Sequence, residues 1–82
     1  MPDHAHAAIA KRLKRANRHL ESIIEMIEQQ RPCAEIAQQL QAVEGAIENA
    51  KKALITDHFS HSLKGSGAKA LLRDFEAIAK YL

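Results

Sequence analysis

The stretch CAEIAQQLQAVEGAIENAKKALITDHFSHSL, residues 33–63, decides the fold of this 82-residue chain. Its apolar side chains recur at alternating steps of four and three residues, the spacing of a helix that packs against other helices. The positions are Ile36, Leu40, Val43, Ile47, Ala50 and Leu54. The same steps lead on to His58 and His61, and the stretch begins at Cys33, the only cysteine. An apolar helix face that ends in a thiol and two imidazoles predicts a sensor site within a helical interface.

The composition predicts a small all-α protein that assembles from several copies. Hydrophobic residues make up 46% of the chain, many of them alanine, and aromatic residues only 4%. This profile is typical of closely packed helices rather than of a β-sandwich or barrel. Residues 1–82 are expected to form one domain. Because a domain of this size buries little surface, and because the apolar seam is longer than one chain can cover, we expect a homodimer or a larger homo-oligomer.

The cysteine content and the absence of long apolar runs indicate a cytoplasmic protein without a membrane partner. One cysteine cannot form an intrachain disulfide, and it suits a reducing compartment. No apolar run approaches the ~18 residues of a membrane span, and the N-terminus lacks the apolar core of a signal peptide. The sequence contains no convincing nucleophile–base pair or carboxylate pair, so we do not expect an enzyme.

Residues 9–29 are predicted to form a first long helix with a segregated charge pattern. Its apolar seam repeats the steps of the second helix and consists of Ile9, Leu13, Ala16, Leu20, Ile23 and Ile27. Five cations fall within eight positions, namely Lys11, Arg12, Lys14, Arg15 and Arg18. Acidic residues follow them, at Glu21, Glu25 and Glu28. Such a basic face suits contact with DNA phosphates, with Arg12, Lys14, Arg15 and Arg18 as the binding residues. The alternatives are a solvated surface and a helical interaction module that docks an acidic protein without binding DNA.

A tight turn at residues 30–32 and a short third helix complete the predicted three-helix protomer. Pro32 disfavours helix at the preceding residue, so the first two helices should form an antiparallel hairpin. Gly65 and Gly67 are expected to end the second helix, and Ser66 can cap the next one. Residues 68–82 are predicted as the third helix, with an apolar seam at Leu71, Phe75, Ile78 and Leu82.

The spacing of the candidate metal ligands requires two chains. Cys33 and His58 stand 25 residues apart, which is about 37 Å on an unbroken helix. If the helix pairs antiparallel with its copy, Cys33 of one chain lies near His58 of the other. The hairpin also brings the N-terminal segment MPDHAHAA, with His4 and His6, level with His58.

The candidate ligands favour certain metals. One thiolate with several imidazoles suits Ni(II), Co(II), Zn(II) or Cu(II), whereas Cu(I) prefers more sulfur. Taken alone, each residue is better explained without a metal: Cys33 as a small buried residue, His58 as part of an amphipathic helix end, His61 as a surface residue, and the N-terminal histidines as part of a frayed terminus. Their convergence is what favours a metal site.

Cys33, the run QQLQAVEGAI and His58 at a distance of 25 residues resemble the CsoR/RcnR/FrmR family of bacterial repressors. The resemblance extends from RLKRA in the first helix to DHFSH. It implies a disc-shaped tetramer, built as a dimer of antiparallel dimers, that releases operator DNA when an effector binds. By position, the family's DNA-contacting arginines fall on Arg12 and Arg15. Arg18 stands where the family usually has glycine.

The sensing positions resemble the nickel/cobalt branch of that family most closely. The copper branch has a second cysteine where this chain has Ser62, which leaves a trigonal thiolate site for Cu(I) incomplete. The nickel/cobalt branch has a histidine where this chain has Ser62, and also an N-terminal histidine. This chain lacks the first, but His4, His6 and the adjacent His61 are available. We therefore expect release by Ni(II) or Co(II), with Zn(II) or copper possible. The formaldehyde branch needs only an N-terminal proline and the cysteine, so a methylene bridge between Pro2 and Cys33 is the alternative.

Overall fold

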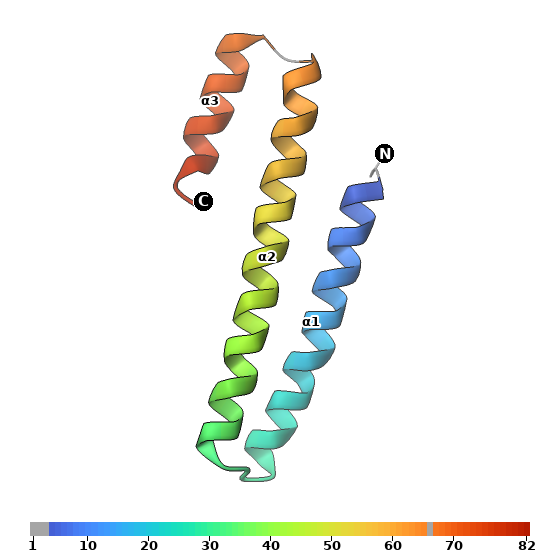
Figure 1. The fold of residues 1–82 in the computed structure, drawn as a ribbon, viewed down its shortest axis with the longest axis vertical. Helices are drawn as coiled ribbons and strands as arrows, with labels where there is room; N and C mark the ends of the chain where they lie inside the picture. Colours follow the sequence, from blue (N-terminus) through green and yellow to red (C-terminus); the bar gives the residue numbers. More distant parts are fainter. Residues whose placement is uncertain (1–3, 66) are drawn as a thin grey trace.

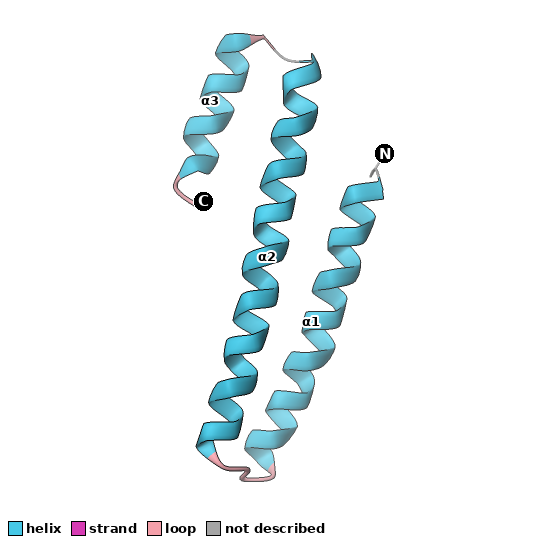
Figure 2. Ribbon diagram, viewed as in Figure 1, coloured by secondary structure: helices cyan, strands magenta, loops and turns pink. Residues whose placement is uncertain are grey.

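The computed structural model describes residues 4–65 and 67–82, and every regular element among them is a helix. The three helices are α1 (His4–Glu28), α2 (Cys33–Gly65) and α3 (Ala68–Ala79). Figure 1 shows α1 and α2 as an antiparallel hairpin, with α3 folded back beside the second half of α2, and Figure 2 shows the helical content. The expected all-α, three-helix protomer is confirmed. Pro2 and Ser66 lie outside the described residues.

The helix boundaries differ from the predicted ones mainly at the N-terminus. Helix α1 begins at His4 rather than at residue 9, because the alanine-rich segment 5–8 has high helix propensity and no helix breaker. Helix α2 begins at Cys33 as predicted and runs on to Gly65. Helix α3 ends at Ala79, three residues before the predicted end. Gly67 takes the N-cap position of α3 and makes no side-chain capping hydrogen bond.

The turn between α1 and α2 is closed by backbone hydrogen bonds. The Arg31 N–H donates to the carbonyl of Met26 and the Gln30 N–H donates to that of Ile27, each at 3.0 Å. Gln30 has a φ of 57°. Together these features form a Schellman motif, which satisfies carbonyls at the end of α1 but normally has glycine at the left-handed position. A glutamine there stores some strain in the turn.

The core of the hairpin uses three of the six predicted seam residues of α1, and two of the six of α2 together with Ile55, which the predicted seam did not include. The buried side chains are Ile9, Ala16 and Ile23 from α1 and Val43, Ala50 and Ile55 from α2. The alternate seam positions are exposed, namely Leu13, Leu20, Ile27, Leu40, Ile47 and Leu54. A flat protomer of 54 × 26 × 13 Å is too thin to cover both sides of the seam. We refer to Leu40, Ile47 and Leu54 as the α2 stripe.

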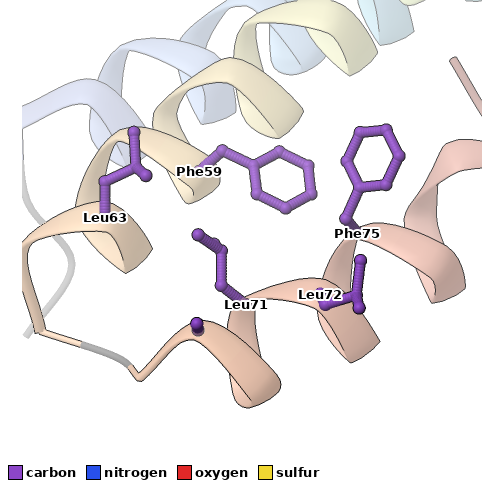
Figure 3. A pocket seen from close by; sticks show the side chains of 6 residues that line it. Phe59, Leu63, Leu71, Leu72 and Phe75 are labelled. Carbon is purple, nitrogen blue, oxygen red and sulfur yellow. The ribbon is translucent and has the colours of Figure 1, made fainter.

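Helix α3 packs on α2 through a small aromatic contact. The rings of Phe59 and Phe75 lie 5.8 Å apart between their centroids. Beside them lies an apolar hollow of about 630 Å³, lined by Phe59, Leu63, Ala68, Leu71, Leu72 and Phe75. Figure 3 shows Phe59, Leu71 and Phe75 gathered between the two helices. No residue of α3 is buried. No helix in the described part of the chain is long and apolar enough to cross a membrane.

Candidate sensor and nucleic-acid surfaces

The structure places Cys33 and His58 near opposite ends of α2. Cys33 is the first residue of the helix and is exposed. Helix α2 runs unbroken through Gly45, so about 37 Å of helix separates the two side chains within one chain. Among the described residues, no three histidine, cysteine or acidic side chains form a group that could hold a metal ion. A site that uses both Cys33 and His58 therefore needs a second chain.

Cys33 and His58 share one side of α2 with the α2 stripe. Cys33, Leu40, Ile47 and Leu54 follow at intervals of seven residues, which return to nearly the same side of a helix. His58 follows Leu54 by four residues, one turn further along the same side. The exposed thiol and the exposed apolar side chains thus form one surface along α2 that α1 does not cover, and the half-buried imidazole of His58 continues it at the end where α3 packs.

His58 is held by a carboxylate from α3. Its Nε2 atom forms a hydrogen bond with Oδ2 of Asp74, and its ring lies edge-on to Phe59 with 5.4 Å between centroids. A histidine that binds a metal through one ring nitrogen usually donates the other N–H to a carboxylate or carbonyl. Because Asp74 occupies Nε2, the nitrogen that His58 has left to offer a metal is Nδ1. Sequence reasoning missed Asp74, because no spacing rule links residues across the connection between α2 and α3.

The N-terminal end of α1 lies against α2 one residue before His58. His6 Nε2 is 3.0 Å from Oδ2 of Asp57, whose side chain is mostly buried. His61 Nδ1 lies 3.8 Å from the other carboxylate oxygen, Oδ1, of Asp57. His6 and His58 line the same hollow of the protomer, and Asp57 is a second residue that sequence reasoning missed. The side chain of His4 lies outside the described part of the structure.

Ser62, which stands where the copper branch has its second cysteine, lies next to His58. Together with His58, Arg73 and Asp74 it lines a hollow of about 530 Å³ between α2 and α3. A hydroxyl at this position is a poor ligand for soft Cu(I), which prefers thiolate and thioether sulfur. The residues present on this surface thus offer one thiolate, from Cys33, and otherwise imidazole nitrogens and carboxylate oxygens.

The predicted DNA-binding residues are all exposed on the first half of α1, but they divide into two groups. Arg12 and Arg15 line a hollow of about 590 Å³ between α1 and α2. Lys14 and Arg18 are exposed outside it. Near this hollow His19 Nε2 lies 2.6 Å from Oε1 of Gln39, a hydrogen bond that joins the two helices.

Comparison with known proteins finds a matching family and a similar curated protein. A family described as "Metal-sensitive transcriptional repressor" matches residues 5–82. The chain is also similar to the copper-sensing transcriptional repressor CsoR of Mycobacterium ulcerans, with 34% identity over 76 residues. That alignment covers 87% of this chain and 65% of the relative, so the chain spans about two thirds of the length of the relative. No solved structure gives a significant match.

Proposed function

This chain belongs to the family of metal-sensitive transcriptional repressors, and we propose that it represses metal-efflux genes until Ni(II) or Co(II) binds. Members of this family are repressors, not enzymes, and binding DNA is part of that role. The match also favours DNA over an acidic protein as the partner of the basic half of α1. The proposed molecule is a single 1–82 domain that acts in the cytoplasm as a homo-oligomer.

One observation carries the proposal: Cys33 and His58 lie on the same uncovered apolar side of α2. An antiparallel copy that covers the α2 stripe would bring Cys33 of one chain to His58 of the other, once at each end of the dimer. Burial of these aliphatic side chains is the expected driving force. Two such dimers would make the disc-shaped tetramer of the family.

The charge distribution supports antiparallel pairing. On α1 the cations precede the carboxylates, so the basic and acidic parts of this helix lie toward opposite ends of the protomer. On α2, Glu44 and Glu48 lie level with the basic part of α1, so the separation of charge along the protomer comes from α1. An antiparallel copy sets unlike ends against each other, whereas a parallel copy would set like ends together.

The donor set favours Ni(II) or Co(II) over Cu(I). The Cys33 thiolate, the His58 imidazole and the imidazole of His6, with His4 and His61 as further donors, form a mixed nitrogen and sulfur set suited to borderline divalent metals. Zn(II) and Cu(II) can use the same set. The metal would tie the start of α1 in one chain to the start of α2 in the other, and so couple the sensor to the basic half of α1.

Titration of the DNA-bound protein with each effector tests the proposal. Operator release should follow addition of Ni(II) or Co(II) at the lowest concentrations, ahead of Zn(II) and Cu(I). Release by formaldehyde without metal, lost on substitution of Pro2, would instead assign the Pro2 and Cys33 chemistry. Release by Cu(I) alone would contradict the proposed donor set. Failure of the metal-free protein to bind any operator would overturn the repressor function itself.

A further inference from the structure

The hollow between α1 and α2 has walls from both helices of the hairpin. Arg12, Arg15 and His19 stand at steps of three and four residues, so they share one side of α1. Helix α2 contributes Ala46 and Asn49, three residues apart, and Ala16 completes the lining. The two alanines leave room between the longer polar side chains, and the cavity measures about 590 Å³.

The polar groups of this hollow suit an anion. Two guanidinium groups and one side-chain amide provide hydrogen-bond donors, and no carboxylate lines the cavity. Within residues 4–65 and 67–82, neither Arg12 nor Arg15 forms an ion pair with an acidic side chain. Their positive charge is therefore not compensated by the protomer. Guanidinium groups bind phosphate oxygens through paired N–H donors, which makes arginine well suited to such a site.

A hydrogen bond between α1 and α2 holds the two walls of the hollow together. The half-buried His19 is joined to Gln39 of α2 by a hydrogen bond of 2.6 Å. This contact crosses from one helix to the other beside the hollow, so it helps to set the position of Arg15 relative to Asn49. Because the walls belong to different helices, a shift of α1 along α2 changes the shape of the cavity.

We propose that this hollow seats a single phosphate of the DNA backbone, with Arg12 and Arg15 supplying the charge and Asn49 donating an amide N–H from α2. The inference rests on the proposed repressor function and adds a residue of the second helix to the DNA site. It also suggests how binding of the metal effector could lower the affinity for DNA. A metal that pulls on the start of α1 would shift one wall of the hollow relative to the other, and so change how the guanidinium groups of Arg12 and Arg15 lie relative to Asn49.

The test uses three variants of the full chain and a fluorescent duplex of mixed sequence, because phosphate contacts do not depend on base sequence. Asn49→Ala removes the amide, and Asn49→Lys places a cation in the hollow. Gln41→Lys is the matched control, since it adds the same charge to an exposed position of α2 that does not line the hollow. Affinity is measured by anisotropy over a series of salt concentrations, and circular dichroism confirms that each variant remains helical.

Asn49→Ala should weaken binding roughly 2- to 10-fold, the range for one hydrogen bond, with little change in the salt slope. Asn49→Lys should tighten binding and steepen the slope of log affinity against log salt by about 0.9, as expected for one more neutralised phosphate. Gln41→Lys should leave the slope near the wild-type value. If the wild type binds DNA and releases it with metal, but Asn49→Ala binds equally well or Asn49→Lys behaves as Gln41→Lys, the phosphate seat is wrong and the repressor function stands. If the wild type binds no DNA, both are overturned.

Discussion

At the scale of single residues, the sensor depends on side chains that orient the ligands as well as on the ligands themselves. Asp74 reaches His58 from α3, and Asp57 reaches His6 and His61. The first contact leaves one nitrogen of His58 for the metal, and the second holds the start of α1 against α2. Neither could be predicted from spacing, because both depend on how the helices lie against one another.

Replacing Asp74 should weaken metal binding without removing a ligand. Asp74→Ala frees Nε2 of His58 and allows its ring to turn, and loss of such an orienting carboxylate typically lowers metal affinity by about 10- to 100-fold. Titration with Co(II), followed by its absorption spectrum, measures the change. Glu76→Ala removes an exposed carboxylate from the same helix as a control. Equal affinities for the two variants would show that Asp74 does not orient His58.

Arg15 should contribute to DNA binding through a phosphate rather than through a base. Arg15→Ala is expected to weaken binding to all duplexes alike and to reduce the salt slope by about 0.9, because one fewer counterion is released. Anisotropy with operator and mixed-sequence duplexes measures both quantities. Loss of affinity for the operator alone would assign Arg15 to base recognition instead.

At the scale of helices, periodicity predicted the elements well and their ends less well. The steps of three and four residues located all three helices, and Pro32 located the turn. The extension of α1 back to His4 was not predicted, because alanines carry no periodic signal of their own. The predicted seams of α1 and α2 contained every buried side chain except Ile55, but the sequence could not tell which seam residues one protomer buries. Ile23 packs within the hairpin and Leu20 does not, although both fit the same pattern, because one neighbouring helix covers only part of a wide apolar face.

The turn between α1 and α2 provides a test of local strain. Gln30 adopts a left-handed backbone conformation with a φ of 57°, which glycine reaches without steric cost. Gln30→Gly should raise the free energy of unfolding by roughly 0.5–1 kcal/mol, the strain relieved less the added freedom of the unfolded chain. Urea unfolding at a fixed protein concentration measures it. Gln29→Gly, one residue earlier, should stabilise nothing, and a similar gain from both variants would contradict the assignment of strain to Gln30.

At the scale of the whole molecule, the flat protomer leaves the α2 stripe uncovered, and the proposed assembly buries it. Ile47, at the centre of the stripe, is 47% exposed. Ile47→Glu would place a charge inside the proposed interface, so sedimentation velocity at micromolar protein should find smaller species than for the wild type. Gln38→Glu introduces the same side chain at an exposed position two residues before Leu40, on the opposite side of α2, and should assemble normally. A wild type that sediments as a folded monomer, or an Ile47→Glu variant that assembles unchanged, would contradict the interface.

Metal binding by the assembled protein should release protons. The thiol of Cys33 must lose its proton to act as a ligand, and His58 must bind through a neutral ring, so protons compete with the metal. Affinity for Ni(II) should therefore fall as the pH is lowered. Calorimetry in buffers of different ionisation enthalpy counts the protons released, and His58→Ala should release fewer. A pH-independent affinity would contradict thiolate and imidazole ligation.

The most direct test of a sensor shared between chains is complementation between two inactive variants. Cys33→Ala and His58→Ala chains, each carrying a different affinity tag, are co-expressed and the mixed dimer is purified through both tags. Each homodimer should lack an intact site, whereas the mixed dimer should bind one metal ion with wild-type affinity, because one end pairs an intact Cys33 with an intact His58 and the other end pairs the two alanines. A mixed dimer that folds and assembles but binds no metal would show that Cys33 and His58 do not meet across the interface.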